Sequence, residues 1–454
     1  MGREFSRVLG VSVLNPRSTA LLTDHYELTM LQATLASGHA DRPCVFEAFT
    51  RRLPEGRRYG VVAGTGRFLE ALAEFTFGTE EIDFLRERTI VDEATLDYLA
   101  SYRFTGDIWG YAEGECYFPG SPLMIVESTF AEGVVLETLA LSILNHDSAI
   151  AAAASRMTAT AGDRPCIEMG SRRTHERSAV AAARAAYIAG FDSTSNLEAG
   201  RSFDIPTRGT AAHSFTLLHD SEREAFASQL SSLGLSTTLL VDTYDVTGAV
   251  TLAVELAGPE LGGVRLDSGD LVSQAHEVRE QLDSLGATDT RIVVTSDLDE
   301  HAIAALQAAP VDAYGVGTRV VTGSGHPAAG MVYKLVARAD ADGTMVGVAK
   351  ASKDKSSMGG RKFALRRRNS TGVAHEELIG IGSAPVDDGD DRPLLVQLVR
   401  GGEVIVPTDA RSAREHHANS RAELPTKALR LSHGDPALRT VYQDEQSRTE
   451  VEED

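Results

Sequence analysis

The chain has 454 residues, of which 42% are apolar and 24% charged, a composition typical of a globular protein with two or three packed regions. Its 44 basic and 65 acidic residues give a net charge of −21, so we expect no nucleic-acid partner and no membrane partner. An anionic substrate would have to meet a local basic cluster. Three widely spaced cysteines without a Cys-x-x-Cys pair predict neither disulfides nor a zinc site, and they favour a cytoplasmic protein.

The N-terminal region, residues 1–135, is expected to mix helices and strands. Asp24 precedes a predicted helix, and Val45–Phe49 has the pattern of a strand that runs into Arg51. Tyr26, on the first helical turn, is suited either to stacking on a flat ring or to packing inward. Arg51 lies either on a solvated rim or beside an anionic ligand.

Leu136–Met157 is a long apolar segment with helical periodicity. The pattern predicts a buried packing helix. Asn145 and His146 interrupt it, and we interpret both first as hydrogen-bonded groups of the core.

From residue 163 onward, strand and helix patterns alternate, which predicts parallel strands joined by right-handed crossovers. We expect residues 136–330 to close into a barrel. The expected fold class is therefore α/β: a parallel-stranded TIM-like (β/α) barrel with an additional α+β, β-rich domain built from the N- and C-terminal parts. The predicted strands are Cys166–Gly170, Phe191–Ser195, Thr238–Val241, Val264–Leu266, Ile292–Thr295 and Ala313–Val316.

Polar residues follow the end of each predicted strand or stand in the next turn. In α/β barrels the active site is assembled at the carboxyl ends of the strands. A single polar group would be a helix cap, but seven successive polar groups at strand ends or in the following turns, mixing arginine with aspartate, predict a site. The ends carry Ser171-Arg172-Arg173, Ser195-Asn196, His213, Asp242-Thr243-Tyr244-Asp245, Arg265-Leu266-Asp267-Ser268, Ser296-Asp297 and Gly315-Val316-Gly317-Thr318.

The basic and glycine-rich ends suit an anion. Arg172, Arg173 and Arg265 present fork-shaped donors that match a carboxylate or a phosphate. The turn Gly315–Thr318 exposes backbone N–H groups that a phosphate can approach without meeting a side chain. No P-loop motif occurs, so the chain does not bind a nucleotide in that way.

The acidic ends and the histidine leave alternatives open. Asp242, Asp245 and Asp267 suit Mg²⁺ or ribose hydroxyls, and each also suits a helix cap. His213 lies among small residues in the segment GTAAHSFTLLHD, ahead of a predicted helix. It is therefore suited to act as a base or nucleophile, or to be a hydrogen-bonded loop histidine.

Residues 331–440 are predicted to form a β-rich region that packs with the N-terminal part, followed by an acidic flexible tail at 441–454. A basic segment that includes Ser352, Lys355 and Lys362 suits either an anionic substrate or a protected strand edge. The predicted strands are Met331–Ala337, Lys362–Arg366 and Leu394–Leu398.

Taken in order, these motifs resemble those of the nicotinate phosphoribosyltransferases, of the type II phosphoribosyltransferase family, over most of residues 20–365. The motifs that carry the resemblance are Asp24-His25-Tyr26, Phe46-Glu47 with Arg51, Gly170-Ser171-Arg172-Arg173, Gly190-Phe191-Asp192, Thr194-Ser195-Asn196, Gly209-Thr210-Ala211-Ala212-His213-Ser214, Asp242-Thr243-Tyr244-Asp245, Arg265-Leu266-Asp267-Ser268-Gly269-Asp270 and Gly315-Val316-Gly317-Thr318.

The resemblance implies an enzyme that joins nicotinate to 5-phosphoribosyl 1-pyrophosphate, giving nicotinate mononucleotide and pyrophosphate in NAD synthesis. ATP would be a co-substrate hydrolysed through a phosphorylated His213, and Asp242 and Asp267 would hold Mg²⁺. A homodimer with shared active sites is implied, in which Tyr26 of the neighbouring subunit stacks on the pyridine ring. Arg265 would meet the nicotinate carboxylate, and Asp267 the ribose or the metal.

The base and the other contacts follow from the same resemblance. Relatives that use nicotinamide carry an aspartate where this chain has Ser195, and the missing negative charge favours nicotinate. Met169 replaces a usual aromatic residue, so one stacking face would be a thioether. The substrate-binding residues that the resemblance implies are Asp24, Tyr26, Arg51, Gly170, Arg172, Arg173, Ser195, Asp242, Gly315, Gly317, Thr318, Ser352, Lys355 and Lys362.

Other classes of protein make different demands on the sequence. A barrel lyase or isomerase acting on a sugar phosphate would share the phosphate turn but would usually carry a lysine at a strand end, and we find none there. A non-catalytic nucleotide-binding or scaffold protein would have lost His213, Arg265 or Asp267, and all three are present. Within the family, nicotinamide and quinolinate are the alternative bases.

Overall fold

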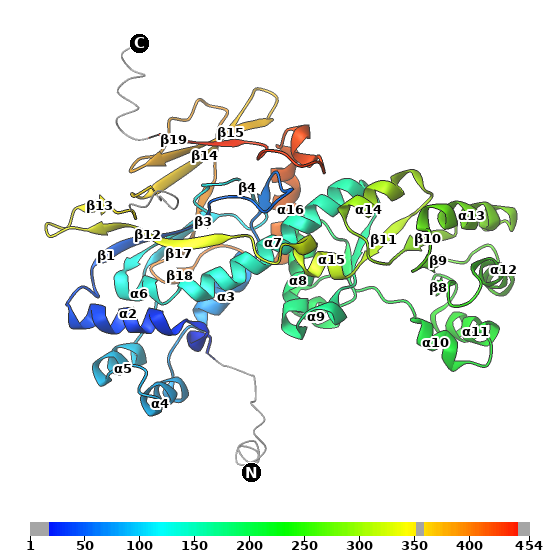
Figure 1. The fold of residues 1–454 in the computed structure, drawn as a ribbon, viewed down its shortest axis with the longest axis horizontal. Helices are drawn as coiled ribbons and strands as arrows, with labels where there is room; N and C mark the ends of the chain where they lie inside the picture. The colour runs from blue at the N-terminus through cyan, green and yellow to red at the C-terminus, as the bar shows by residue number, and fades with distance from the viewer. Residues whose placement is uncertain (1–17, 351–357, 444–454) are drawn as a thin grey trace.

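The computed structural model describes residues 18–350 and 358–443. Two groups of sheets lie on either side of a long central helix, α7 (Glu137–Ala161). Two antiparallel sheets and one mixed sheet, built from both ends of the chain, lie on one side, and a parallel sheet lies on the other (Figure 1). Within these ranges no helix combines the length and the apolar character needed to cross a membrane.

The larger antiparallel sheet has seven strands and interleaves the two ends of the chain. Strand β1 pairs with β12 on one side and with β5 on the other, for example through Ala48, which lies opposite both Tyr333 and Met124. In order across the sheet the strands are β13 (Met345–Gly347), β12 (Met331–Ala339), β1 (Pro43–Thr50), β5 (Met124–Thr129), β3 (Asp107–Tyr111), β17 (Leu395–Arg400) and β18 (Glu403–Val404). Helices of the N-terminal region accompany it, namely α2 (His25–Ala36), α3 (Thr65–Ala73), α4 (Thr79–Glu87), α5 (Glu93–Ala100) and α6 (Phe130–Val134).

A four-stranded sheet and a two-stranded sheet complete this side. Arg366 of the four-stranded sheet is fully buried and pairs with Glu377 at 2.6 Å, while its guanidinium donates to Cys116 O at 2.6 Å. This contact ties the four-stranded sheet to the small one. The two sheets are, in order, β16 (Arg392–Pro393), β14 (Lys362–Arg368), β15 (Ala374–Ile381) and β19 (Arg439–Gln443), and β2 (Gly60–Val61) with β4 (Cys116–Tyr117).

The C-terminal part contains a helix that the sequence analysis did not predict, α16 (Ala410–Ala422). Asp409 caps it by accepting a hydrogen bond from Ser412 N at 2.8 Å. The segment predicted as a tail, 441–454, begins inside β19, and residues 444–454 lie outside the described residues.

The parallel sheet confirms the alternation predicted after residue 163, with each strand end within two residues of its expected position. Between the strands lie, among others, α8 (Glu176–Ile188), α12 (Val246–Ala257), α13 (Leu271–Ser284) and α14 (Glu300–Ala305). In order the strands are β7 (Ser193–Thr194), β6 (Cys166–Glu168), β11 (Ala313–Val316), β10 (Arg291–Val294), β9 (Gly263–Leu266) and β8 (Thr238–Leu240).

The predicted closure into a TIM-like barrel is wrong, because this sheet is open. The edge strands β7 and β8 do not pair with each other among the described residues. The chain between them forms the helices α9 (Leu197–Phe203), α10 (His213–Leu218) and α11 (Glu222–Leu233), and only a single bridge, Thr194 to Thr207, extends the edge. A two-residue strand followed by helices offers no continuous ladder to complete a ring.

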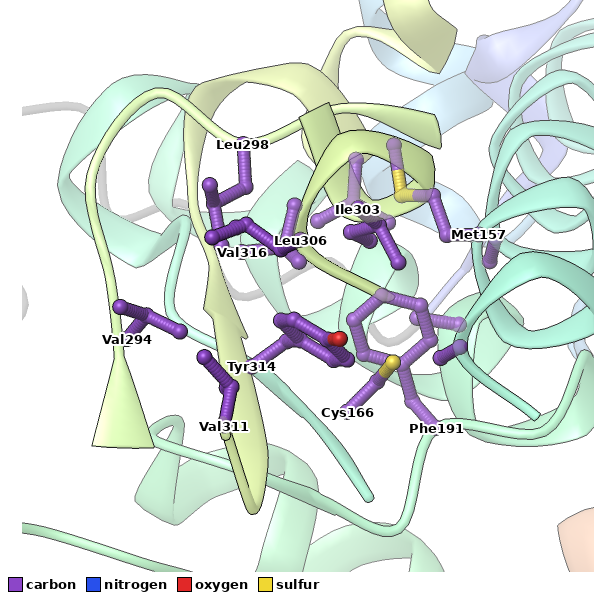
Figure 2. Packing of buried hydrophobic residues seen from close by; sticks show 14 of the residues in the cluster. Met157, Cys166, Phe191, Val294, Leu298, Ile303, Leu306, Val311, Tyr314 and Val316 are labelled. Carbon is purple, nitrogen blue, oxygen red and sulfur yellow. The ribbon is translucent and has the colours of Figure 1, made fainter. Parts of the chain in front are cut away.

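Helix α7 is buried along most of its length, as its apolar pattern predicted. Leu139 and Leu144 belong to the core on the antiparallel side, whereas Ile150 and Met157 belong to the core under the parallel sheet. Figure 2 shows Met157 in one cluster with Cys166, Phe191 and Tyr314.

Polar groups of α7 are paired with partners on both sides. Asn145 Oδ1 accepts from Met331 N at 2.7 Å, and His146 Nδ1 lies 2.8 Å from Asp147 Oδ1, which confirms the interpretation of both residues as satisfied core groups. Arg156 Nε donates to Glu300 Oε1 at 3.0 Å. These contacts fix α7 to the strand β12 and to α14.

His417 of α16 is a buried titratable group in this framework. Its Nε2 lies 2.9 Å from Ser155 Oγ, and its Nδ1 lies 2.9 Å from Gly114 O. Burial, with the nearby charge of Arg421, lowers the pKa of His417 to about 4, against the opposing effects of Gly114 O and Glu115. Since the unfolded chain takes up the proton near pH 6.5, the folded state loses stability as pH falls from 6.5 toward 4.

We therefore expect the free energy of unfolding to fall by about 2 kcal/mol between pH 7 and pH 5 through this residue. In His417→Gln the loss over that interval should be smaller, because the glutamine does not titrate. Urea denaturation at each pH measures it, with the exposed His39→Gln as control. Equal pH slopes for wild type and His417→Gln would contradict the assignment.

Candidate active site

A cavity of about 460 Å³ opens at the carboxyl ends of the parallel strands. It is lined by residues at the ends of β9 and β11 and by residues that follow β6, β7, β9, β10 and β11, which brings most of the predicted strand ends together. The lining residues are Met169, Ser171, Arg172, Arg173, Ser195, Arg208, Gly209, Thr210, Ala211, Ala212, Arg265, Asp267, Thr295, Ser296, Asp297, Gly315, Gly317 and Thr318.

The cavity is positively charged although the chain is strongly acidic. Four arginines line it, namely Arg172, Arg173, Arg208 and Arg265, against the two carboxylates Asp267 and Asp297. The lining therefore carries a formal charge of +2 in a chain of −21. Because Arg172 and Arg173 are exposed on the turn after β6, they are free to meet an anion from solvent.

Arg265 is the most enclosed cation of the cavity, with 13% of its side chain exposed. Its Nη1 donates to Thr210 Oγ1 and to Ala211 O, the latter at 3.1 Å. Burial lowers the pKa of Arg265, while Asp267 and Asp242 oppose the shift. Among the described residues its buried Nε has no hydrogen-bond partner, so the guanidinium keeps a donor unused.

His213 begins α10 at the rim of the cavity: its neighbours Ala211 and Ala212 line the cavity, whereas His213 itself does not, and 40% of its side chain is exposed. Its Nδ1 lies 3.1 Å from Thr243 Oγ1. Its Nε2 faces Asp267, with 3.9 Å between Nε2 and Oδ2. One ring nitrogen is thus held by a hydroxyl, and the other faces a carboxylate that lines the cavity.

The two predicted aspartates are linked through the end of β9. Asp242 Oδ2 accepts from Asp267 N at 2.9 Å and from Ser268 Oγ at 2.8 Å. Asp242 Oδ1 is buried and has no hydrogen-bond partner in the part of the chain that the structure describes. Asp267 Oδ1 accepts from Thr295 Oγ1, and its Oδ2 lies 4.0 Å from Arg265 Nη2. Asp245, in contrast, caps α12 by accepting from Gly248 N at 2.7 Å.

Two of the glycines are required by close approach of neighbouring atoms. A Cβ at Gly170 would lie 2.3 Å from Val321 Cγ1 and 2.9 Å from Gly317 O. A Cβ at Gly315 would lie 2.5 Å from Thr295 Cγ2 and would enter the cavity wall. The absence of side chains therefore lets the turn after β6 pack against the turn after β11.

A buried carboxylate beneath the cavity joins two of its turns. Glu168, at the end of β6, accepts from Gly170 N and from Thr194 Oγ1. Asn196 Nδ2 in turn donates to Ser171 Oγ at 3.0 Å. The arginine turn and the Ser195 turn are thereby held at a fixed separation.

Four residues of this site had no predicted site role: Glu168, Arg208, Thr210 and Thr295. Arg208 and Thr210 flank the glycine that opens the His213 segment, so closeness to that histidine was an available signal. Thr295 was assigned as the last residue of a strand, and nothing in its local pattern shows that it contacts Asp267.

Several predicted residues lie away from the cavity. Asp24 caps α2 by accepting from Tyr26 N at 3.3 Å, and α2 lies on the opposite side of the molecule from β8–β11 (Figure 1). Arg51 lines a separate cavity of about 600 Å³ with Arg52 and His326. Lys362 is buried in an ion pair with Glu47. Two further predicted residues, Ser352 and Lys355, lie outside the described residues.

Arginines, glycine turns and an aspartate lie together at the carboxyl edge of an open parallel sheet, where α/β proteins commonly bind their ligands, and the excess of arginines suits an anionic ligand. Residues 21–145 match the family model described as the nicotinate phosphoribosyltransferase (NAPRTase) N-terminal domain. A nicotinate phosphoribosyltransferase of Mycobacterium tuberculosis (strain CDC 1551 / Oshkosh) is 57% identical over 435 residues, covering 94% of this chain and 96% of that protein. A nicotinate phosphoribosyltransferase of Bacillus subtilis is 38% identical over 366 residues, covering 78% of this chain and 74% of that protein.

Two solved structures share the fold of this chain. The human nicotinic acid phosphoribosyltransferase superposes with a TM-score of 0.79 at 26% identity, covering 95% of this chain and 99% of that one. The nicotinate-nucleotide pyrophosphorylase of Pyrococcus furiosus shares the fold, with a TM-score of 0.74 at 23% identity and coverage of 91% and 97%. The chain belongs to the nicotinate phosphoribosyltransferase family, transferases of NAD biosynthesis.

The glycine contacts generate a matched pair of variants. We expect Gly170→Ala to weaken pyrophosphate binding and to lower the free energy of unfolding by about 1–3 kcal/mol, because its methyl group would displace Val321 and the Gly317 carbonyl. Gly209→Ala, at a residue that lines the cavity but has nothing within 4 Å of its Cβ, should leave both quantities unchanged. Calorimetric titration with pyrophosphate and urea denaturation measure the two effects. Equal pyrophosphate binding and equal unfolding free energies in the two variants would contradict a steric need for glycine at position 170.

Proposed function

We propose that this protein joins nicotinate to 5-phosphoribosyl 1-pyrophosphate, giving nicotinate mononucleotide and pyrophosphate. The observation that carries the proposal is the +2 cavity at the strand ends of a chain that is 57% identical to a nicotinate phosphoribosyltransferase. A cytoplasmic location agrees with three cysteines that are all buried and unpaired.

The cavity offers a separate group for each part of the substrates. Arg265, with its unused Nε donor, suits the nicotinate carboxylate. Ser195 lines the cavity as a small neutral group, so no carboxylate repels that of nicotinate. Met169 offers a thioether face to the ring. The 5′-phosphate would bind Arg172 and the backbone of Gly315–Thr318, where the glycines at 315 and 317 present no side chain of their own.

The reaction breaks the bond between ribose C1 and the pyrophosphate oxygen and forms a bond between C1 and the pyridine nitrogen. Positive charge develops on the ribosyl carbon in the transition state, and Asp267 is the nearby anion that can stabilise it. Arg173 and Arg208 can take up the charge that grows on the leaving pyrophosphate. Catalysis is therefore mainly alignment and charge stabilisation.

Asp242 and Asp267 fit a Mg²⁺ site. Asp242 Oδ1 is a buried carboxylate oxygen without a partner in the described chain, and Asp267 Oδ2 makes no hydrogen bond there, so each offers a free oxygen. Mg²⁺ commonly takes one or two carboxylates together with substrate phosphates. When bound, it would neutralise pyrophosphate charge.

We further propose that ATP hydrolysis is coupled to the reaction through His213. With Nδ1 engaged by Thr243, Nε2 is the nitrogen available as nucleophile. It would attack the γ-phosphorus of ATP, so that a nitrogen–phosphorus bond forms, the bond to the β-phosphate oxygen breaks and ADP leaves. Water later releases inorganic phosphate. A phosphoryl group at this rim adds charge close to Asp267 and the bound pyrophosphate.

A homodimer with shared sites is part of the proposal. Tyr26 is 44% exposed on α2, and α2 lies on the opposite side of the molecule from the strands β8–β11 (Figure 1). Leu22 beside it is 53% exposed, and Leu197 and Leu218 near the cavity are 77% and 78% exposed. These exposed apolar side chains suit an isologous dimer contact. In such a dimer the Tyr26 surface of each subunit would meet the Leu197 and Leu218 surface of the other.

The ATP step predicts a difference between two histidine variants. In wild type, ATP should stimulate formation of nicotinate mononucleotide, and His213→Ala should lose that stimulation and all phosphohistidine. His219→Gln, a change in the same short segment, should keep both, because His219 Nδ1 is engaged by Phe215 O, outside the cavity lining. Product formation with and without ATP measures the effect. No product under any condition would favour a lyase or isomerase of sugar phosphates instead.

The shared site predicts complementation between subunits. Tyr26→Ala and His213→Ala should each be impaired alone, measured at limiting nicotinate in the presence of ATP. After mixing and reassociation, half of the dimers are mixed, and each mixed dimer holds one intact site, so about a quarter of wild-type activity should return. Activity equal to the sum of the separate variants would mean that both residues serve the same chain's site.

A further inference from the structure

Thr295 is a buried cavity residue that none of the roles above uses. It follows β10 directly, is 4% exposed, and lines the cavity. Its N donates to Leu266 O at 2.8 Å, and its Oγ1 donates to Asp267 Oδ1. Both its main chain and its side chain are thus attached to the end of β9.

The carboxylate of Asp267 is fixed on one oxygen and open on the other. Its Oδ1 is held by Thr295, and its backbone N is held by Asp242. Its Oδ2 lies 3.9 Å from His213 Nε2 and 4.0 Å from Arg265 Nη2, beyond hydrogen-bond distance of either. A single carboxylate oxygen therefore faces the phosphorylation site and the base-binding arginine at nearly equal distances.

Without the hydroxyl of Thr295, a closer pairing of Asp267 with Arg265 would compete with the observed position of Asp267 Oδ2 between His213 and Arg265. A guanidinium and a carboxylate pair most strongly when both oxygens meet both nitrogens. Rotation of the freed Asp267 carboxylate toward Arg265 would give such a fork-to-fork pair and take Oδ2 away from His213. The hydrogen bond from Thr295 holds Oδ1 in place and opposes that rotation.

The backbone conformation of the residue after Thr295 also indicates that Thr295 is held in a fixed position. Ser296 has a φ of 120°, in the region that residues other than glycine rarely adopt, and with Asp297 it lines the cavity. Such conformations persist where the surrounding structure determines them, and they gather at functional sites. The strand β10 thus ends at Val294, and the next residue, Thr295, places its hydroxyl on Asp267.

We infer that Thr295 is a positioning residue that holds Asp267 Oδ2 between His213 and Arg265, so that one carboxylate couples phosphorylation of His213 to binding of the base and the sugar phosphate. The inference rests on the proposed function. It assigns to Thr295 no direct contact with the reacting atoms.

The test compares Thr295→Val with Thr295→Ser in the full-length protein. Valine keeps the methyl group that packs over Gly315 and removes the hydroxyl, whereas serine keeps the hydroxyl. We expect valine to lower kcat/KM for 5-phosphoribosyl 1-pyrophosphate about 10- to 100-fold and to lower the nicotinate mononucleotide formed per ATP hydrolysed. Serine should restore both quantities to within about threefold of wild type.

A second measurement separates positioning from a general loss of structure. Calorimetric titration with pyrophosphate and Mg²⁺, without turnover, should show weaker binding in Thr295→Val than in wild type. In an Asp267→Ala background the same valine should cause no further loss, because its effect passes through that carboxylate. Melting temperatures identify a variant that simply fails to fold.

The outcomes distinguish the two proposals. A wild type that forms product without any use of ATP overturns the coupled reaction, and the inference on Thr295 falls with it. A coupled wild type with an unchanged Thr295→Val overturns the inference alone. Equal losses in valine and serine, or an undiminished valine effect in the Asp267→Ala background, also overturn it.

Discussion

One helix, α7, must be buried in two cores at once, and the rest of the architecture depends on that requirement. Its first half packs with the antiparallel side and its second half with the parallel side. The charges that it carries inward are paired: Asp147 with Arg67 at 2.8 Å, and Arg156 with Glu300 at 3.0 Å. An unpaired buried charge would cost several kcal/mol, so these ion pairs are a condition for burying the helix. The two sheet systems are thereby held together around α7.

The cavity uses the geometry that α7 supports. Parallel strands end at the same edge, so short turns bring side chains from distant parts of the chain within a few ångströms of one another. Four arginines meet two aspartates there, and the excess of positive charge is local in a chain of −21. The surrounding acidic surface discourages other polyanions, while the cavity attracts a small one.

At the centre of that cavity, charge is arranged by hydrogen bonds to neutral groups. Thr243 engages His213, Thr210 engages Arg265, and Thr295 engages Asp267. Each hydroxyl fixes one side of its partner side chain and leaves the other side open. The open sides converge: His213 Nε2 and Arg265 Nη2 lie 3.9 and 4.0 Å from the same carboxylate oxygen. Substrates and phosphoryl groups would then act on charges whose orientation is set before they bind.

The sequence by itself determined the parallel strands, the buried helix α7 and the set of polar strand ends, because hydrophobic periodicity and helix caps are local properties of the chain. It also singled out Arg172, Arg265 and Asp267, which the cavity brings together. Only the tertiary structure decided that the sheet stays open, because closure depends on pairing between two edges distant in the chain. It alone placed Lys362 in an ion pair with Glu47 and set the hydroxyl of Thr295 on Asp267. Such contacts follow from strand register and long-range packing, which no local pattern encodes.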